Sequence, residues 1–259
     1  MANRVRYYPV MTTALLDEIF ASIQGEGPWV GQRHIFVRFM GCDLRCGYCD
    51  TPAAVNDPRD SPSACKVQVS PQSFDRESIA NPIAPAVLTD LCDRLTLPGQ
   101  QHPVVSLTGG EPLLHREFLE QWLPMLGRRY RVYLETNGIQ HKAMERLAGF
   151  IDVVSMDIKL PSATGQTERW GDHRKFLEAA KDRVLFVKTV LTRDTTTDDL
   201  ASALTLVAEQ GLAIPFIIQP ASGMQAPPVE KLIAFQNKAL GTLADVRVIP
   251  QIHKMLLVP

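Results

Sequence analysis

Residues 39–51 of the chain are Phe39-Met40-Gly41-Cys42-Asp43-Leu44-Arg45-Cys46-Gly47-Tyr48-Cys49-Asp50-Thr51, and they hold three of its five cysteines in the spacing C-x3-C-x2-C. The run just before them, 34–39, is apolar and rich in β-branched and aromatic residues, which predicts a buried strand. Thiolate sulfur is the soft ligand that zinc, copper(I) and iron–sulfur clusters prefer. The stretch therefore predicts a soft metal centre in the loop that follows a strand.

The absence of a fourth, equally close cysteine bears on which metal centre this is. Cys65 lies sixteen residues beyond Cys49, and Cys92 falls within an apolar pattern of helical spacing, so neither has the tight spacing of a fourth ligand. Structural zinc sites are closed by four ligands, whereas a catalytic centre keeps one position open. An iron–sulfur cluster with one open iron fits best. A Cys3His zinc site completed by His34 or His115, or a redox dithiol, is the alternative from these residues alone.

Composition narrows the classes of protein that the chain can belong to. Its 259 residues suffice for one α/β domain or two small ones. A formal net charge of −1 predicts no bulk affinity for nucleic acid, and no run approaches the ~18 apolar residues of a membrane span. An odd number of clustered cysteines argues against a secreted disulfide framework. We therefore expect a cytoplasmic protein with no nucleic-acid or membrane partner.

Strands and helices alternate along the chain, which predicts βα units and a parallel sheet. Expected strands cover 34–39, 104–107, 132–134, 153–156, 184–190, 214–218 and 246–249, and expected helices cover 85–95, 116–126, 142–147, 175–180, 198–209 and 229–240. About six repeated units are too few for an eight-fold barrel. We expect one domain over 1–259, a partial (β/α)6 TIM-like barrel with a mostly parallel sheet. Residues 52–82, rich in proline, serine and aspartate, are expected to form an irregular insertion.

Polar segments follow the expected strands at their carboxyl ends, where parallel α/β folds build active sites. These segments are 42–51, 108–112, 135–138, 155–159, 188–189 and 219–223. Within them, the pair Gly109-Gly110 removes side chains where backbone can approach a ligand. A separate loop, Gln24-Gly25-Glu26-Gly27-Pro28, is expected to be a turn that exposes a carboxylate and an amide.

The cysteine loop, with Tyr48 before its third cysteine and Thr108-Gly109-Gly110-Glu111-Pro112 one strand later, resembles the radical S-adenosylmethionine superfamily. The resemblance implies that Cys42, Cys46 and Cys49 hold a [4Fe–4S] cluster. It also implies that the open iron binds the amino and carboxylate groups of S-adenosylmethionine, which is cleaved to a 5′-deoxyadenosyl radical.

More of the chain is similar to one family within that superfamily, 7-carboxy-7-deazaguanine synthase. The similarity rests on seven motifs: SIQGEGP at 22–28, FVR at 36–38, CDT at 49–51, LTGGEP at 107–112, ETNG at 135–138, QP at 219–220 and PQIHK at 250–254. It implies a lyase of queuosine biosynthesis that converts 6-carboxy-5,6,7,8-tetrahydropterin to 7-carboxy-7-deazaguanine by a radical ring contraction with loss of ammonia. It also implies Mg²⁺, a homodimer and an electron donor such as flavodoxin or ferredoxin. The 52–82 segment is expected either to cap the mouth of the barrel or to contact the electron donor.

The same resemblance implies roles for individual residues. Thr51 would bind Mg²⁺ through its hydroxyl oxygen, and no residue is assigned to proton transfer. Substrate contacts are expected from Ile23, Gln24, Gly25, Arg38, Thr108 and the carboxylate of Pro259. Contacts with S-adenosylmethionine are expected from Tyr48, Asp50, Gly110, Ser155, Asp157, Lys159 and Gln219.

Several alternatives remain open from the residues themselves. Arg38 lies in an apolar strand and suits a substrate carboxylate, but it could instead pair with Glu26 or Glu135 as scaffold. Lys159 could be a surface lysine, and 253–254 a solvated tail. At the level of function, the alternatives are a glycyl-radical activating enzyme that acts on a protein and a non-catalytic zinc-binding module.

Overall fold

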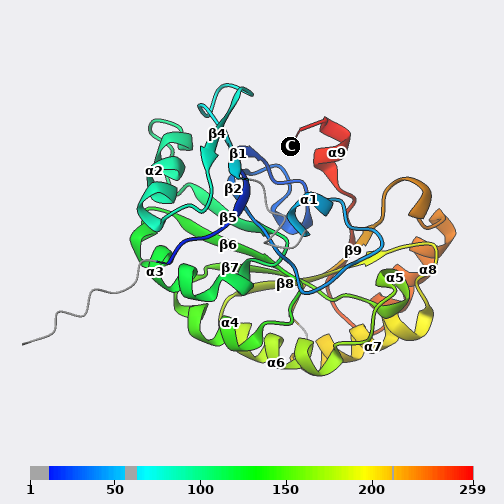
Figure 1. The fold of residues 1–259 in the computed structure, drawn as a ribbon. Helices are drawn as coiled ribbons and strands as arrows, with labels where there is room; N and C mark the ends of the chain where they lie inside the picture. The colour runs from blue at the N-terminus through cyan, green and yellow to red at the C-terminus, as the bar shows by residue number, and fades with distance from the viewer. Residues whose placement is uncertain (1–11, 56–62, 212, 259) are drawn as a thin grey trace, which may run out of the picture.

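A ten-stranded sheet, in the order β10-β9-β8-β7-β6-β5-β2-β1-β3-β4, organises the computed structural model, which describes residues 12–55, 63–211 and 213–258 (Figure 1). Its strands are β1 (Leu16–Ile23), β2 (Arg33–Phe39), β3 (Ala64–Gln68), β4 (Arg76–Ala80), β5 (Val104–Gly109), β6 (Arg131–Thr136), β7 (Val153–Asp157), β8 (Val184–Leu191), β9 (Phe216–Pro220) and β10 (Val246–Val248). Strands β2 and β5 to β10 are parallel to one another. Within the described ranges, no pairing joins β10 to β4, so the barrel is open.

Helices cover the outer face of this sheet, as Figure 1 shows for α3, α4, α6, α7 and α8. The helices are α1 (Pro52–Val55), α2 (Pro85–Leu95), α3 (Arg116–Leu126), α4 (His141–Leu147), α5 (Pro161–Thr164), α6 (Trp170–Ala180), α7 (Thr197–Ala208), α8 (Val229–Leu240) and α9 (Ile252–Leu256). The predicted α/β class and the partial, mostly parallel barrel are confirmed.

The core forms where one apolar stripe of each helix meets the sheet. In α3 the buried side chains are Phe118, Leu119, Trp122, Leu123 and Leu126, which recur at helical spacing. The strands between the helix layer and the cavity are buried along most of their length, as in β7, where every residue is buried. Rigid strands therefore present their carboxyl ends at fixed positions.

The N-terminal strand β1 is not among the strands expected from the sequence, because residues 11–23 form an apolar run without a clear alternation of polar and apolar side chains. It pairs antiparallel with β2, with Glu18 directly opposite Arg38. The first parallel strand is thereby flanked by β1 on one side and β5 on the other. The predicted strand over 214–218 also lies two residues later, as Phe216–Pro220.

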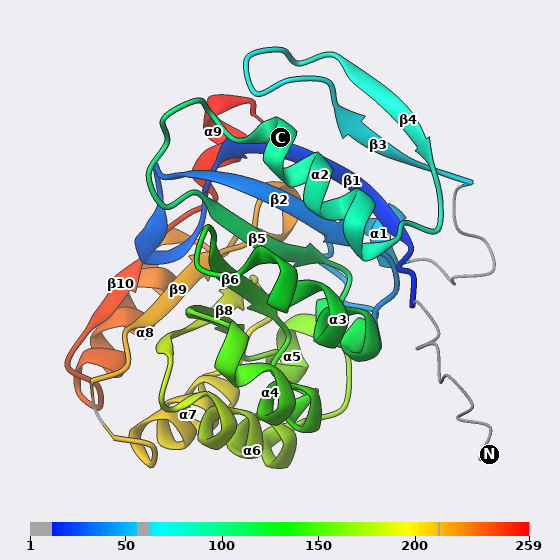
Figure 2. The ribbon, with the colours of Figure 1, turned by 90° about the vertical axis from the view of Figure 1, so that its left-hand side faces the viewer.

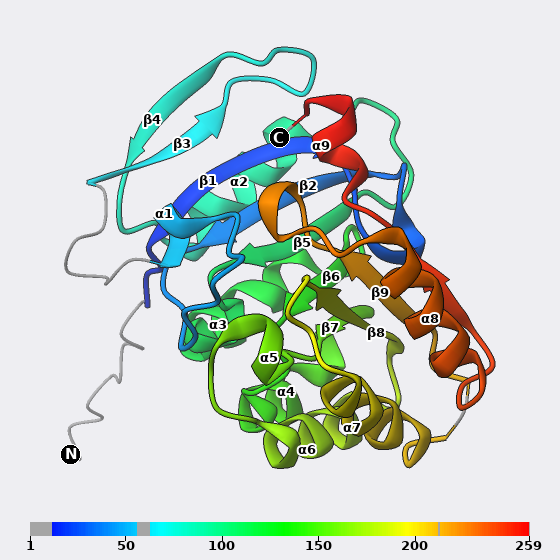
Figure 3. The same cartoon turned by 90° about the vertical axis from the view of Figure 1, so that its right-hand side faces the viewer.

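The expected irregular insertion over 52–82 instead contains α1 and a β-hairpin of β3 and β4 wherever it is described. Strand β3 runs parallel to β1, so the hairpin extends the sheet at one edge (Figures 2 and 3). Strand β4 is an edge strand with the sequence RESIA and mostly exposed side chains, which gives no apolar alternation to recognise. Residues 56–62 of the segment lie outside the described part.

None of the helices in the described part of the chain has the length and apolar character needed to cross a membrane.

Candidate active site

The carboxyl ends of the parallel strands surround a cavity of about 520 Å³, here called the mouth cavity. Of the predicted site residues, these line it: Ile23, Gln24, Gly25, Arg38, Cys42, Cys46, Tyr48, Cys49, Asp50, Thr51, Thr108, Gly110, Asp157, Lys159 and Gln219. Ser155 does not line it, because it lies two residues before Asp157 on the same face of β7 and is 1% exposed. Pro259 lies outside the described residues.

Backbone contacts hold the start of the cysteine loop against the β5 end. The Gly41 N–H donates to the Ala54 carbonyl at 2.7 Å, and the Glu111 N–H donates to the Gly41 carbonyl at 2.8 Å. Gly110 packs so closely that an added Cβ would fall 1.9 Å from the Gly41 oxygen. Glycine is therefore required at position 110 by the approach of two backbones.

Asp43, between the first two cysteines, ties the loop to the segment after β6. Its two carboxylate oxygens accept hydrogen bonds from the side-chain amides of Asn137 and Gln140, both at 2.7 Å. Arg45 donates to the Cys42 carbonyl at 2.6 Å. The loop is thus shaped by its non-cysteine side chains.

The three cysteines of the loop are free thiols at the cavity wall. Burial raises the pKa of Cys42 to about 11, and it also raises the pKa of Cys46. A metal that binds here must displace these protons. The Thr51 hydroxyl lies 3.9 Å from the sulfur of Cys49, close enough for a hard cation held by Thr51 to lie beside the thiols.

Neither histidine proposed for a Cys3His zinc site lines the cavity with the thiols. His34 is buried in the sheet and shares a hydrogen bond with Ser106 at 2.7 Å, and His115 donates to the Met40 carbonyl at 2.7 Å. Cys65 and Cys92 are buried outside the cavity lining. The described residues thus offer three cysteine sulfurs from one loop, and neither a fourth cysteine nor His34 or His115 lines the cavity with them, which suits a cluster with an open iron.

Glu111 is fully buried and organises the segment after β6. Its carboxylate accepts the N–H groups of Leu113 at 3.1 Å and Asn137 at 2.8 Å and the hydroxyl of Thr136 at 2.9 Å. Burial nevertheless raises the pKa of Glu111 to about 7. Through Asn137, this carboxyl supports the amide that holds Asp43.

Glu111 gives a pH prediction. A carboxyl whose pKa rises from 4.5 to about 7 on folding contributes stability that is fully present below pH 4.5 and is lost as pH rises through 7. The shift corresponds to about 3 kcal/mol. We expect the free energy of unfolding of the Glu111→Gln variant to lack this decrease with pH. Denaturant unfolding of the wild type and the variant at pH 5 and pH 8 measures the effect. If the two free energies of unfolding differ by the same amount at both pH values, the prediction is contradicted.

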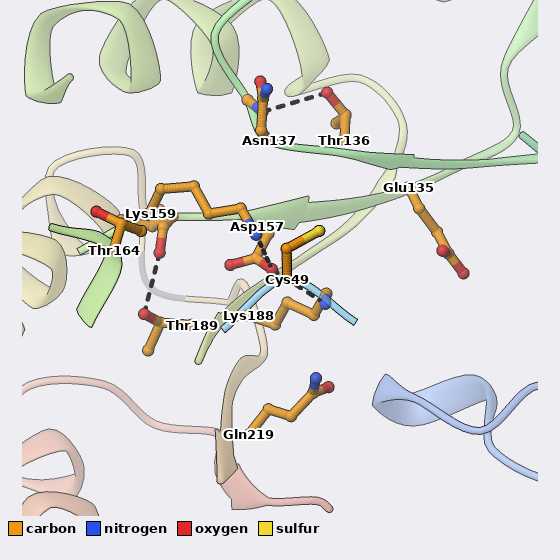
Figure 4. Close-up of polar contacts among 12 residues, drawn as sticks. Cys49, Glu135, Thr136, Asn137, Asp157, Lys159, Thr164, Lys188, Thr189 and Gln219 are labelled. Carbon is orange, nitrogen blue, oxygen red and sulfur yellow. Dashed lines mark hydrogen bonds and ion pairs between the residues drawn. The ribbon is translucent and has the colours of Figure 1, made fainter. Parts of the chain in front are cut away.

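A chain of alternating charges crosses the floor of the mouth cavity. Asp157 lies between two ammonium groups, 2.8 Å from Lys159 Nζ and 3.1 Å from Lys188 Nζ (Figure 4). Lys188 also pairs with Glu26 at 2.8 Å. Burial opposes ionisation, but Asp157 raises the pKa of Lys159, and both lysines hold the pKa of Asp157 below its usual range. All four groups are therefore charged at neutral pH, and Lys159 is no surface lysine.

Glu26 corrects the expectation of an exposed turn at 24–28. Its side chain is 15% exposed, and its carboxylate also accepts hydrogen bonds from Gln251 at 2.7 Å and Gln219 at 3.3 Å. Gln24 is 2% exposed; its amide donates to Glu135 at 3.0 Å and its oxygen accepts the Glu26 N–H at 3.0 Å. The loop is a wall of the cavity because these partners offset the burial of its polar groups.

Two buried oxygens at the cavity that can only accept hydrogen bonds, Asp157 Oδ1 and Gln219 Oε1, have no partner among the described residues. Both side chains line the cavity, and in Figure 4 they come from different strands toward the same region as Cys49. Unsatisfied buried oxygens are rare, so they indicate a ligand that donates hydrogen bonds, such as an ammonium or amino group. The amino group of S-adenosylmethionine fits this requirement.

Glu135 brings a further carboxylate to the cavity, from the end of β6. It accepts the Thr108 hydroxyl at 2.6 Å in addition to the Gln24 amide. Burial, together with the nearby charge of Glu26, raises the pKa of Glu135. A buried carboxylate with few donors can accept N–H groups from a ligand.

Arg38 pairs with neither Glu26 nor Glu135, the two scaffold partners considered from sequence. Its Nε donates to Glu18 of β1 at 2.8 Å. The alternative of a pair with Glu26 or Glu135 was wrong because β1 had not been recognised as the neighbouring strand. Arg38 still lines the cavity.

Gln251, His253 and Lys254 line the cavity beside the 24–28 loop, so 253–254 are no solvated tail. The Ile252 N–H donates to the Gly25 carbonyl at 2.9 Å, and an added Cβ on Gly25 would lie 2.2 Å from His253 Nδ1. Lys254 pairs with Asp50 at 3.0 Å. Burial alone would raise the pKa of Asp50, but hydrogen bonds from Gln251 and Lys254 bring it to about 2.

Six residues for which the sequence predicted no individual role also line the cavity: Glu26, Glu135, Lys188, Gln251, His253 and Lys254. Lys188 and Glu135 carried a usable signal, since each is a charged residue at the carboxyl end of an apolar strand. Gln251 carried none, because its contacts depend on the path of the chain after β10.

Comparisons with known proteins show the family to which the chain belongs. The family model described as the radical SAM superfamily matches residues 36–207. The chain is 40% identical to the 7-carboxy-7-deazaguanine synthase of Geobacter sulfurreducens over 94% of this chain and 97% of that protein. It is 32% identical to the protein of the same name from Methanothermobacter thermautotrophicus, over 95% and 98%.

A solved structure, that of QueE from Escherichia coli, has a similar fold. The TM-score is 0.59 at 19% sequence identity, covering 91% of this chain and 93% of the other.

Proposed function

The chain belongs to the radical SAM superfamily and, within it, to the 7-carboxy-7-deazaguanine synthase family, and from this membership we propose how its site performs that reaction. The enzyme is a radical SAM lyase of queuosine biosynthesis. It converts 6-carboxy-5,6,7,8-tetrahydropterin to 7-carboxy-7-deazaguanine with release of ammonia. The alternatives, a glycyl-radical activating enzyme and a zinc-binding module, are not favoured by these relatives.

Cys42, Cys46 and Cys49 would hold the [4Fe–4S] cluster. When bound, the cluster and S-adenosylmethionine would supply the radical chemistry that removes hydrogen from the substrate. The protein's part is to place the reacting groups and to keep water out. The three-thiol loop facing a cavity with unpaired buried acceptors is the observation that carries the proposal.

We assign the cofactor side of the cavity to Tyr48, Asp50, Gly110, Asp157, Lys159 and Gln219. Asp157 and Gln219 offer free acceptor oxygens for an amino group, and Lys159 offers positive charge for a carboxylate. Ser155 is 1% exposed and does not line the cavity, so its contribution to the cofactor side would be indirect.

We assign the substrate side to Arg38, Thr108, Ile23, Gln24 and Gly25. A guanidinium suits the pterin carboxylate. Glu135 and Glu26, both facing the cavity, can accept the N–H groups of the pterin's aminopyrimidinone ring. The side chain of Gln24 is engaged by Glu135 and the Glu26 N–H, so its role is to orient Glu135. The carboxylate of Pro259 stays a proposed contact.

Thr51, whose hydroxyl lies 3.9 Å from the Cys49 sulfur, would offer Mg²⁺ that oxygen. An electron donor such as flavodoxin or ferredoxin would reduce the cluster, and the enzyme would work as a homodimer. Five free cysteines, three of them required as thiolates, suit a reducing cytoplasm.

The test is anaerobic reconstitution followed by two measurements. We expect the electron paramagnetic resonance spectrum of the reduced cluster to change when S-adenosylmethionine is added. We also expect 7-carboxy-7-deazaguanine and ammonia to form only when the pterin, S-adenosylmethionine and reductant are all present. Bound zinc without iron or sulfide, or a cluster signal indifferent to S-adenosylmethionine, would refute the proposal.

A further inference from the structure

Glu18, on β1, lies between two arginines that come from different strands. Arg38 of β2 donates from Nε to its Oε1 at 2.8 Å, and Arg76 of β4 donates from Nη1 to its Oε2. Both guanidinium carbons lie over the ring of Phe20, at 5.7 Å for Arg38 and 5.4 Å for Arg76. We call Arg38, Glu18 and Arg76 the arginine–glutamate triad.

The triad carries one net positive charge next to the mouth cavity. Burial opposes the charge on Glu18, but the two arginines hold its pKa below the usual range, so it is ionised at neutral pH. Arg38 lines the cavity, whereas Arg76 lies behind Glu18 and does not. Without Arg76, Arg38 and Glu18 would form a neutral pair.

Glu18 engages only part of the Arg38 guanidinium. No hydrogen bond within the described residues engages its two terminal nitrogens. A guanidinium held at Nε keeps an edge with two N–H donors for a second carboxylate. Its 15% exposed side chain is sheltered enough for such a pair to be weakly screened.

We propose that Arg76, on the β3–β4 hairpin, is a specificity-determining residue for the carboxylate of the substrate. It counters the charge of Glu18, so that Glu18 can fix Arg38 without cancelling the positive charge that Arg38 presents to the cavity. Arg76 acts through its neighbours and touches no reacting atom. The inference rests on the proposed function, because it requires a carboxylated substrate at Arg38.

The experiment compares two ligands on the reconstituted enzyme with S-adenosylmethionine and without reductant. One is 6-carboxy-5,6,7,8-tetrahydropterin, and the other is tetrahydropterin without the carboxyl group. Arg76→Gln is expected to weaken binding of the carboxylated ligand about 10-fold, since one net charge is removed near a partly buried pair. Binding of the other ligand is expected to change less than about 2-fold. In turnover, KM should rise by the same factor while kcat stays within about 2-fold.

Three further variants separate charge from scaffold. Arg76→Lys keeps the charge and should bind like the wild type. The double variant Glu18→Gln with Arg76→Gln restores the net charge, and the amide oxygen introduced at position 18 can still accept the Arg38 Nε–H, so carboxylate affinity should return. Glu77→Gln, the neighbour on β4 that pairs with Arg94, is the matched control and should change neither affinity.

Equal weakening of both ligands by Arg76→Gln, or failure of the double variant to recover, would show a scaffold role and overturn the inference. So would an unchanged affinity for the carboxylated ligand. If the wild type neither binds the carboxylated pterin nor forms product, the proposed function fails instead. Folding of each variant is checked by thermal unfolding, and Arg76→Lys with the double variant keeps the test decisive if Arg76→Gln does not fold.

Discussion

Replacing Cys46 by serine is expected to remove the iron–sulfur cluster and to lower turnover by ~10³-fold or more. The three cysteines bind the cluster together, so the loss of one ligand abolishes the function of all three. Cys46 is the middle thiol of the loop and lines the mouth cavity. Serine keeps the size but replaces a soft thiolate by a hard hydroxyl, which iron–sulfur clusters rarely accept. The same result is expected for Cys42 and Cys49.

Iron and sulfide content, together with the absorbance of the cluster after anaerobic reconstitution, checks this prediction. Cys92→Ala is the matched control. Cys92 is buried in α2 outside the cavity lining, so its loss should cost stability through a small cavity but leave iron content unchanged. Full iron content in Cys46→Ser, or iron loss in Cys92→Ala, would contradict the assignment of the loop.

The second large effect is expected at Gly110. A Cβ there would lie 1.9 Å from the Gly41 oxygen, 2.6 Å from the Gly41 carbonyl carbon and 3.0 Å from the Ala54 oxygen. All three are backbone atoms, so no side chain can rotate away. Gly110→Ala should therefore destabilise the protein by about 3 kcal/mol. It should also displace Gly41, and with it Cys42, so that the loop binds iron poorly.

Gly47→Ala is the matched control, since Gly47 lies inside the cysteine loop and an added Cβ would meet nothing within 4 Å. Thermal unfolding and iron content of the two variants give the comparison. Equal iron content in both would mean that the contact between the β5 end and Gly41 does not position the cluster loop.

Much of the fold was predictable because it depends on local patterns. The β2 and β5 to β10 strands are apolar runs flanked by turn residues. The helix predicted over 198–209 is α7, which begins at Thr197 and is capped by Thr196, whose hydroxyl accepts the Asp199 N–H. The hairpin of β3 and β4 was not predictable in this way, since an exposed edge strand needs no apolar face.

The candidate site was predictable to the extent that its residues occupy strand ends. Position along the chain located Cys42, Asp157 and Gln219 at the mouth. Position along the chain could not give the hydrogen-bond and ion-pair partners of these residues, because those partners depend on the order of the strands in the sheet. Arg38 illustrates this, because its partner Glu18 comes from a strand that shows no alternation in sequence. Gln251 shows it again, since it joins Glu26 and Asp50 from more than two hundred residues away.

The weak anchoring of α9 has a consequence for how ligands reach the site. Within the described part of the chain, this five-residue helix is held by one backbone hydrogen bond to Gly25, by the packing of His253 on Gly25 and by the contacts of Gln251 and Lys254, while Met255 and Leu256 are 71% and 51% exposed. Little apolar surface opposes its detachment, so it can open at a free energy far below that of global unfolding. Ligands can then enter and leave through a local opening at α9, while β2 and the cysteine loop that follows it stay in place.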